Sequence, residues 1–181
     1  MKFVIFSFVI VLSSVAVLFT LDEGKVRNYT TIGICKESLL LVTTRPSAIE
    51  INNSRVVSGE MSKEEASKWI NSLDRSDGLK KSMIEMLSDR SVTEIFASID
   101  YSGEKRLIGD YRSEFICGFV TNVFGDTVFE TITDNNKTYS FSDIFFIKDR
   151  PKNTDISGNL SDITFVDRIN YLVSLVSSDK T

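Results

Sequence analysis

The sequence predicts an α+β protein: an N-terminal transmembrane helix or signal peptide, then one mainly antiparallel β domain with two or three helices. Three observations lead to this prediction. An uncharged apolar run opens the chain, short strand patterns separated by turn residues fill its middle, and helical apolar patterns lie on either side of them. The 181 residues suit one domain with an appendage, and 42% hydrophobic residues suffice for a packed core.

The apolar run spans residues 3–21, nineteen residues without a charge between Lys2 and Asp22. As a helix rising roughly 1.5 Å per residue, it nearly matches the hydrocarbon core of a bilayer. We expect a single-pass anchor in the inner (plasma) membrane, with residues 22–181 as a periplasmic or equivalent extracytoplasmic domain. The alternatives are a signal peptide cleaved after Ala16, which would give a secreted protein, and a buried helix of a cytosolic protein.

Residues 29–59 are predicted to form short strands. Residues 29–35 and 39–44 are rich in β-branched and apolar side chains, which favour strands. Residues 48–51 and 55–57 flank Asn52-Asn53, a pair that tolerates the left-handed backbone of a tight hairpin. We therefore expect a hairpin at this pair.

Two short helices should follow. Ser62 and Glu65 have the spacing of a capping box, and Ala66, Trp69, Ile70 and Leu73 recur behind them at helical intervals. After Asp77-Gly78, a second pattern of this kind runs from Leu79 to Leu87. We expect Trp69 to anchor the core, with an exposed partner contact as the alternative.

From Val92 the pattern is a meander of antiparallel strands. The predicted turns are Ser102-Gly103, Gly125-Asp126 and 134–136, and the predicted strands are 95–101, 105–111, 114–124, 127–133, 137–141 and 144–147. Residues 116–144 would suit a small bent-strand barrel of the SH3 or Sm type. The pattern alone leaves an open sheet equally possible.

Bulky aromatic residues lie mostly in the second half of the chain. Nine of the thirteen phenylalanines fall between Phe96 and Phe165, and none falls between residues 20 and 95. The second half should therefore supply most of the core. A last helix, capped by Ser161 or Asp162, should cover a sheet face with one apolar stripe: Phe165, Val166, Ile169, Leu172, Val173 and Val176.

Cys35 and Cys117 are the only cysteines, and both lie in apolar, strand-like runs. In an exported chain two such thiols usually pair, so we predict a disulfide linking the light N-terminal layer to the aromatic sheet. The bridge would contribute roughly 4–5 kcal/mol in the chain-entropy model. Two separate buried thiols are the main alternative, and the Cys-x-x-Cys spacing of a redox-active pair is absent.

The composition excludes several kinds of chemistry. Without histidine, the chain has no Ser-His-Asp or Cys-His nucleophile and no His-ligated haem, and two cysteines alone cannot hold a structural zinc. A net charge of -4 without a basic stripe gives no nucleic-acid footprint. The Ser-x-x-Lys match at residues 102–105 lacks its companion motifs, and residues 73–84 fail as a calcium loop. We predict no catalytic, cofactor-binding or metal-binding residue.

These observations favour a non-enzymatic, membrane-tethered accessory protein. Its exported domain would bind a partner protein, such as a membrane-bound regulator, or a small apolar ligand, through a sheet face or edge that helices leave uncovered. In layout alone the chain is similar to the small companions of membrane-bound transcriptional regulators. Two alternatives stay open: an exported inhibitor or immunity protein that presents an acidic loop (residues 74–77 or 134–136), and a carboxylate-based hydrolase of cell-wall or glycan material.

Overall fold

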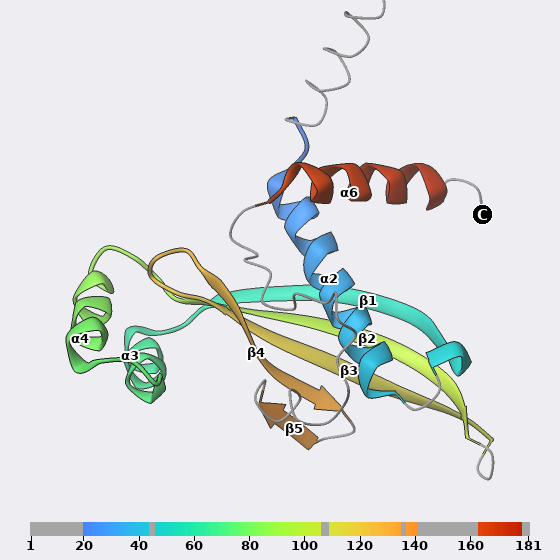
Figure 1. Ribbon diagram of the computed structural model, residues 1–181, viewed down its shortest axis with the longest axis horizontal. Coiled ribbons are helices and arrows are strands. Elements are labelled where there is room, and N and C mark those ends of the chain that lie inside the picture. Colours follow the sequence, from blue (N-terminus) through green and yellow to red (C-terminus); the bar gives the residue numbers. More distant parts are fainter. Residues whose placement is uncertain (1–19, 44–45, 106–108, 135–136, 141–162, 179–181) are drawn as a thin grey trace, which may run out of the picture. The chain divides into compact units, whose positions relative to one another are not determined.

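A computed structural model describes residues 20–43, 46–105, 109–134, 137–140 and 163–178 (Figure 1). The chain divides into two compact units. One comprises Met1–Thr30 and Asp162–Thr181, and the other comprises Thr31–Ser161. Helix α2 runs through the boundary, so its first turns belong to the first unit and the rest to the second.

The second unit is built on a five-stranded antiparallel sheet in the order β1-β2-β3-β4-β5. This meander confirms the predicted antiparallel α+β class. The sheet is not closed, so the open alternative holds and the SH3- or Sm-type barrel is wrong. The strands are β1 (Ile49–Glu60), β2 (Thr93–Lys105), β3 (Gly109–Thr121), β4 (Thr127–Asp134) and β5 (Lys137–Ser140).

Helix α2 (Glu23–Val42) stands where the sequence predicted two strands, at residues 29–35 and 39–44, and that prediction is wrong. Intrinsic helix propensities of ordinary residues differ by less than about 1 kcal/mol, so tertiary packing overrides them. The helical period is visible only when polar residues are counted, because the buried positions include Thr31 and Ser38 beside Cys35 and Leu39. The Ser38 hydroxyl is satisfied within the helix, donating to the Ile34 carbonyl at 2.9 Å.

Two further local predictions fail because long strand ladders override local turn chemistry. Asn52-Asn53 forms no hairpin: β1 pairs with β2 from Ile49 to Glu60, and the pairing register shifts only between Ile51 and Asn53. Ser102-Gly103 also lies within a ladder, inside β2. The missing side chain of Gly103 leaves room for the ring of Tyr111, whose nearest atom lies 3.0 Å from where a Cβ would sit.

The helices between β1 and β2 are confirmed as α3 (Lys63–Ser72) and α4 (Asp77–Met86). Ser62 and Glu65 form the predicted capping box: the Ser62 hydroxyl accepts from the Glu65 amide, and the Glu65 carboxylate accepts from the Ser62 amide. Figure 1 shows this helix pair at the end of the sheet where β1 ends and β2 begins. A separate apolar cluster joins the pair to the end of β3: Ala66, Ile70, Met83, Leu87, Val92, Val120 and Val123.

The main core lies between the second-unit part of α2 and one face of the sheet. As predicted, most of its bulk comes from the second half of the chain, with Phe115, Phe119 and Phe129 at its centre. The rings of Phe119 and Phe129 stack with centroids 4.8 Å apart. The predicted turn at Gly125-Asp126 is also confirmed between β3 and β4.

The last described helix is α6 (Phe165–Ser178), in the first unit. Its cap is Thr164, whose hydroxyl accepts from the Asp167 amide at 3.2 Å, rather than Ser161 or Asp162, which lie outside the described residues. Most of the predicted apolar stripe is exposed to solvent. The short 3-10 helix η1 (Pro46–Ala48) leads into β1.

No helix in the described ranges is long and apolar enough to cross a membrane. The predicted membrane segment, residues 3–21, lies outside those ranges except for Thr20 and Leu21. The predicted strand at residues 144–147 lies outside them as well.

Candidate binding face

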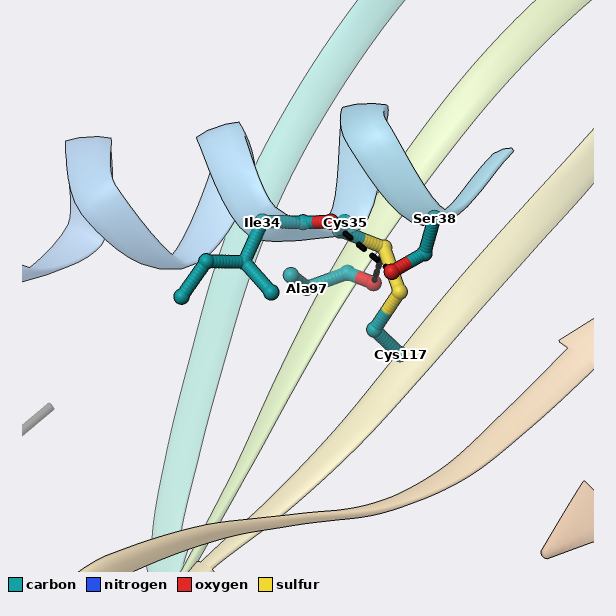
Figure 2. The surroundings of a disulfide bond; sticks show 5 residues. All are labelled: Ile34, Cys35, Ser38, Ala97 and Cys117. Carbon is teal, nitrogen blue, oxygen red and sulfur yellow. Dashed lines mark hydrogen bonds between the residues drawn. A yellow bond between two sulfur atoms is a disulfide. The ribbon is translucent and has the colours of Figure 1, made fainter. Parts of the chain in front are cut away.

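The structure brings the two predicted site residues, Cys35 and Cys117, to disulfide-bonding distance. Their Sγ atoms lie 2.05 Å apart and their Cα atoms 5.7 Å apart. Cys117 lies on a strand as predicted, whereas Cys35 lies on α2. Figure 2 shows the helix crossing above the strands, with Cys35 pointing down to Cys117. The Cys35 sulfur also lies 3.5 Å from the carbonyl oxygen of Ala97.

This link fixes α2 against β3, the central strand of the sheet. Both sulfurs are fully buried and belong to the main core cluster. Side chains alternate between the two faces of a strand, so the residues next to Ala97 and Cys117 point away from α2. The link therefore places α2 on one face of the sheet, and the opposite face does not contact α2 through this link.

We call that other side the open face. It is defined by alternate residues of three neighbouring strands: Asn53, Arg55 and Val57 of β1, Phe96, Ser98 and Asp100 of β2, and Arg112, Glu114, Ile116 and Gly118 of β3.

A polar network occupies one part of the open face. Arg55 Nη2 donates to Glu114 Oε1 at 3.1 Å, across β2, and the Ser98 hydroxyl donates to the same carboxylate oxygen. Arg112 Nε donates to Asp100 at 2.8 Å. Each carboxylate thus has one arginine partner, and the three strands are joined by side chains as well as by their ladders.

Both carboxylates of this network are held ionised. The Ser98 hydrogen bond is the main cause that lowers the pKa of Glu114. Desolvation opposes it, and the hydrogen bond and charge of Arg55 lower the pKa further. The hydrogen bond from Arg112 lowers the pKa of Asp100. The pair is therefore suited to fixed, oriented charge and not to proton transfer near neutral pH.

An apolar strip lies beside the polar network. Val57 and Phe96 face each other across the β1–β2 ladder and are 60% and 42% exposed. Gly118 is the next residue in this row, and the Phe96 ring lies over it, 3.5 Å from where a Cβ would sit. A Cβ at Gly118 would thus make only ordinary contact with the Phe96 ring, and the close approach at this position is to Thr131 Oγ1.

The open face is only slightly hollowed. A shallow depression of about 270 Å³ is lined by polar residues throughout: Asn53, Ser54, Arg55, Ser98, Asp100 and Glu114. Sites for small apolar ligands are usually deep and lined mainly by apolar side chains. This depression therefore does not suit such a ligand.

Trp69 sits at the margin of the second core. It packs against the apolar cluster of α3 and α4, as the core-anchor prediction required, and its Nε1 donates to Glu130 Oε1 at 3.0 Å. Burial raises the pKa of Glu130, the Trp69 hydrogen bond opposes that rise, and the nearby Glu94 adds to it. Glu130 is thus a partly desolvated carboxylate with a single aromatic donor.

The other sequence candidates for chemistry do not converge. Residues 102–105 lie on strand β2. Residues 74–76 belong to the exposed connection between α3 and α4, Asp77 begins α4, and Arg75 lies between the two acids. Asp134 accepts a hydrogen bond from the Tyr101 hydroxyl at 3.1 Å, and burial raises the pKa of Tyr101 to about 12. Within the described ranges, no group of three or more acidic or cysteine side chains is placed to hold a metal ion.

Sequence reasoning missed the residues of the open face. The alternation of Phe96, Ser98 and Asp100 along β2 was a usable signal, but only the cross-strand register shows which arginine meets which carboxylate. Comparisons with protein-family models, curated proteins and solved structures found no match to this chain.

Proposed function

We propose that this chain is a non-enzymatic, membrane-tethered accessory protein whose exported domain binds another protein through the open face. The tether is the uncharged run at residues 3–21, followed by Asp22 and Glu23. The observation that carries the binding role is the exposed Val57–Phe96 strip beside a fixed polar network.

The composition of the open face favours a protein over a small apolar ligand. Protein interfaces combine an apolar, often aromatic centre with polar and charged groups around it. Phe96 and Val57 supply the centre, and Arg55 and Arg112, 68% and 71% exposed, supply charged contacts. A partner would cover Phe96 and meet arginines that intramolecular hydrogen bonds already hold in place.

The hydrolase alternative is less well supported. Acid-base hydrolysis of a glycoside needs one carboxyl group that keeps its proton beside one that is ionised. Asp100 and Glu114 are near each other, but the pKa of both is lowered by arginine and hydroxyl donors. The inhibitor alternative relied on an acidic loop, and Arg75 offsets part of the charge of residues 74–77.

The test is purification of the tagged full chain from membranes in mild detergent, with and without the substitutions Val57→Asp and Phe96→Asp. We expect one partner to copurify stoichiometrically with the parent chain and to be lost from the double variant. The matched control is Leu79→Asp, which changes a side chain on α4 that is 38% exposed and is not one of the residues that define the open face.

Three results would contradict the proposal. They are recovery of the parent chain alone, retention of the partner by the double variant, and equal loss of the partner from the Leu79→Asp control. Thermal unfolding of each variant must match the parent chain, so that loss of the partner is not a consequence of unfolding.

A further inference from the structure

Helix α6 carries an exposed apolar face. Six of its apolar residues are 37% to 67% exposed, and all but Leu175 lie on one side of the helix: Phe165, Val166, Ile169, Val173 and Val176. At 3.6 residues per turn these five positions fall within an arc of about 100°. Isolated exposed apolar residues need no explanation, but a continuous apolar stripe on one helix implies that something covers it.

The opposite side of α6 is attached to the start of α2. Arg168 is buried on that side, and its Nη2 donates to Glu23 Oε1 at 2.7 Å. The rings of Tyr29 and Tyr171 form a second contact, with centroids 5.7 Å apart. These contacts lie within the first unit, and Figure 1 shows α6 beside the first turns of α2.

Glu23 follows the end of the apolar run by two residues. If residues 3–21 span a bilayer, Glu23 lies within a few ångströms of the membrane surface, since the chain advances at most about 3.5 Å per residue. Arg168 then holds α6 at that surface. The position of Glu23 close to the end of the apolar run therefore places the exposed apolar face of α6 near the membrane surface.

We propose that α6 is an interfacial helix that lies on the lipid surface, with the face formed by Phe165, Val166, Ile169, Val173 and Val176 against the acyl boundary. This inference rests on the proposed membrane tether. Amphipathic helices bind in this way by burying one apolar face in the headgroup region. The described helix carries one acid and one base, Asp167 and Arg168, so apolar burial and not attraction to anionic lipid should dominate the contact.

The consequence is a second attachment point. The apolar run alone would leave the exported part free to tilt about residues 20–22, whereas α6 would orient the first unit on the membrane. At about 1.5 Å per residue, the fourteen residues of α6 provide roughly 21 Å of contact along the surface.

The test uses the full chain reconstituted in vesicles of phosphatidylethanolamine and phosphatidylglycerol. A polarity-sensitive fluorophore is attached, without reductant, to Val173→Cys on the apolar face or to Asn170→Cys, an exposed polar position on the same helix. The parent chain must take up no label, since both native sulfurs are paired. Quenching by nitroxide-labelled lipid and by aqueous iodide is then compared at the two positions.

We expect the Val173 label to be blue-shifted, to lose most of its emission to nitroxide lipid and to resist iodide, with the reverse at Asn170. Shielding from iodide without quenching by lipid would overturn the inference, because protein would then cover the face: a second copy, a partner or the sheet itself. Free access of iodide to both positions would overturn it too.

Failure of the tether gives a separate result. If sodium carbonate extracts the full chain from the vesicles, residues 3–21 do not anchor it, and the tether falls together with this inference. If the chain resists extraction but the Val173 label stays in water, the tether stands and only the interfacial helix is wrong. The substitution Arg168→Gln should weaken the attachment of α6 to α2. In a chain that remains anchored, we then expect iodide to quench the label on Val173→Cys more strongly.

Discussion

At the scale of single residues, Gly118 is the most constrained position on the open face. A Cβ there would lie 2.4 Å from Thr131 Oγ1 and 3.5 Å from the Phe96 ring. We expect Gly118→Ala to lower the free energy of unfolding by roughly 1–3 kcal/mol, because a packed surface must move to admit the methyl group. Chemical denaturation measures the loss.

The matched background for this change is Thr131→Ala, which removes the clashing oxygen. In that background Gly118→Ala should lower the free energy of unfolding clearly less than it does in the parent chain. The double-mutant cycle should therefore show coupling between the two positions. Purely additive costs would mean that the clash with Thr131 is not the cause.

Glu130 provides a pH-dependent prediction. Burial raises its pKa above the ordinary 4.5, so its contribution to stability is complete below that value and is lost as pH rises through the folded-state pKa. Glu130→Gln keeps an acceptor for the Trp69 hydrogen bond. Because glutamine does not ionise, the variant does not lose stability as pH rises. The variant should therefore be more stable than the parent chain at pH 7, with a difference that shrinks as pH falls toward 4.

Urea unfolding at both pH values measures this difference. Glu85→Gln, a change at an exposed position on α4, is the control and should show no such trend. A Glu130→Gln variant that is less stable than the parent chain at pH 7 would contradict the raised pKa.

At the scale of secondary-structure elements, the capping box of α3 is a local feature with a built-in comparison. Ser62 accepts a hydrogen bond from the Glu65 amide, whereas Ser76, the N-cap of α4, makes no side-chain capping bond. Ser62→Ala should therefore cost about 1 kcal/mol of stability, and Ser76→Ala much less. Equal costs in thermal or urea unfolding would show that the capping bond is not the source.

The link between α2 and β3 is the second feature at this scale. Cys35 and Cys117 are separated by 82 residues, so removing their bond should lower the free energy of unfolding by about 4–5 kcal/mol in the chain-entropy model. We expect the double variant Cys35→Ala/Cys117→Ala to match the reduced parent chain. Amide exchange should accelerate more in α2 than in β2 and β3. Alkylation of both thiols without reductant would contradict the bond.

These elements also show how much the sequence could predict. The capping box, the α3–α4 pair and the Gly125 turn were predictable because their signals lie within a few residues of one another. Helix α2 was not, because its buried face includes Thr31 and Ser38 and its residues also suit strands. The pairing of Cys35 with Cys117 was predicted from the number of cysteines and the expected exported location. That prediction did not depend on secondary structure, so the wrong assignment of Cys35 to a strand did not affect it.

The open face was beyond sequence reasoning for a related reason. Arg55 and Glu114 are 59 residues apart in the chain. They meet because β1 and β3 lie on either side of β2 and the arginine side chain reaches across that strand. Their contact depends on register, and the register of β1 changes between Ile51 and Asn53. A shift of one residue would turn every side chain of the strand to the opposite face.

At the scale of the whole molecule, the division into two units leads to the last prediction. Among the described residues, both core clusters and the cysteine pair lie within Thr31–Ser161, and α6 supplies no member of either cluster. A chain of residues 22–161, which lacks α6, should therefore lose only the Arg168–Glu23 and Tyr29–Tyr171 contacts, and its free energy of unfolding should fall by no more than about 1–2 kcal/mol relative to residues 22–181.

The comparison also tests the sequence-based expectation that the last helix covers a sheet face. If α6 packed there, its removal would expose a substantial apolar surface, and burying that surface stabilises a fold by roughly 25 cal/mol per Å². Loss of several kcal/mol in the shorter chain would therefore support a helix on the sheet and count against an interfacial helix. We expect only a small loss of stability, together with weaker membrane attachment of the full chain when α6 is removed, because α6 would then serve the membrane and not the core.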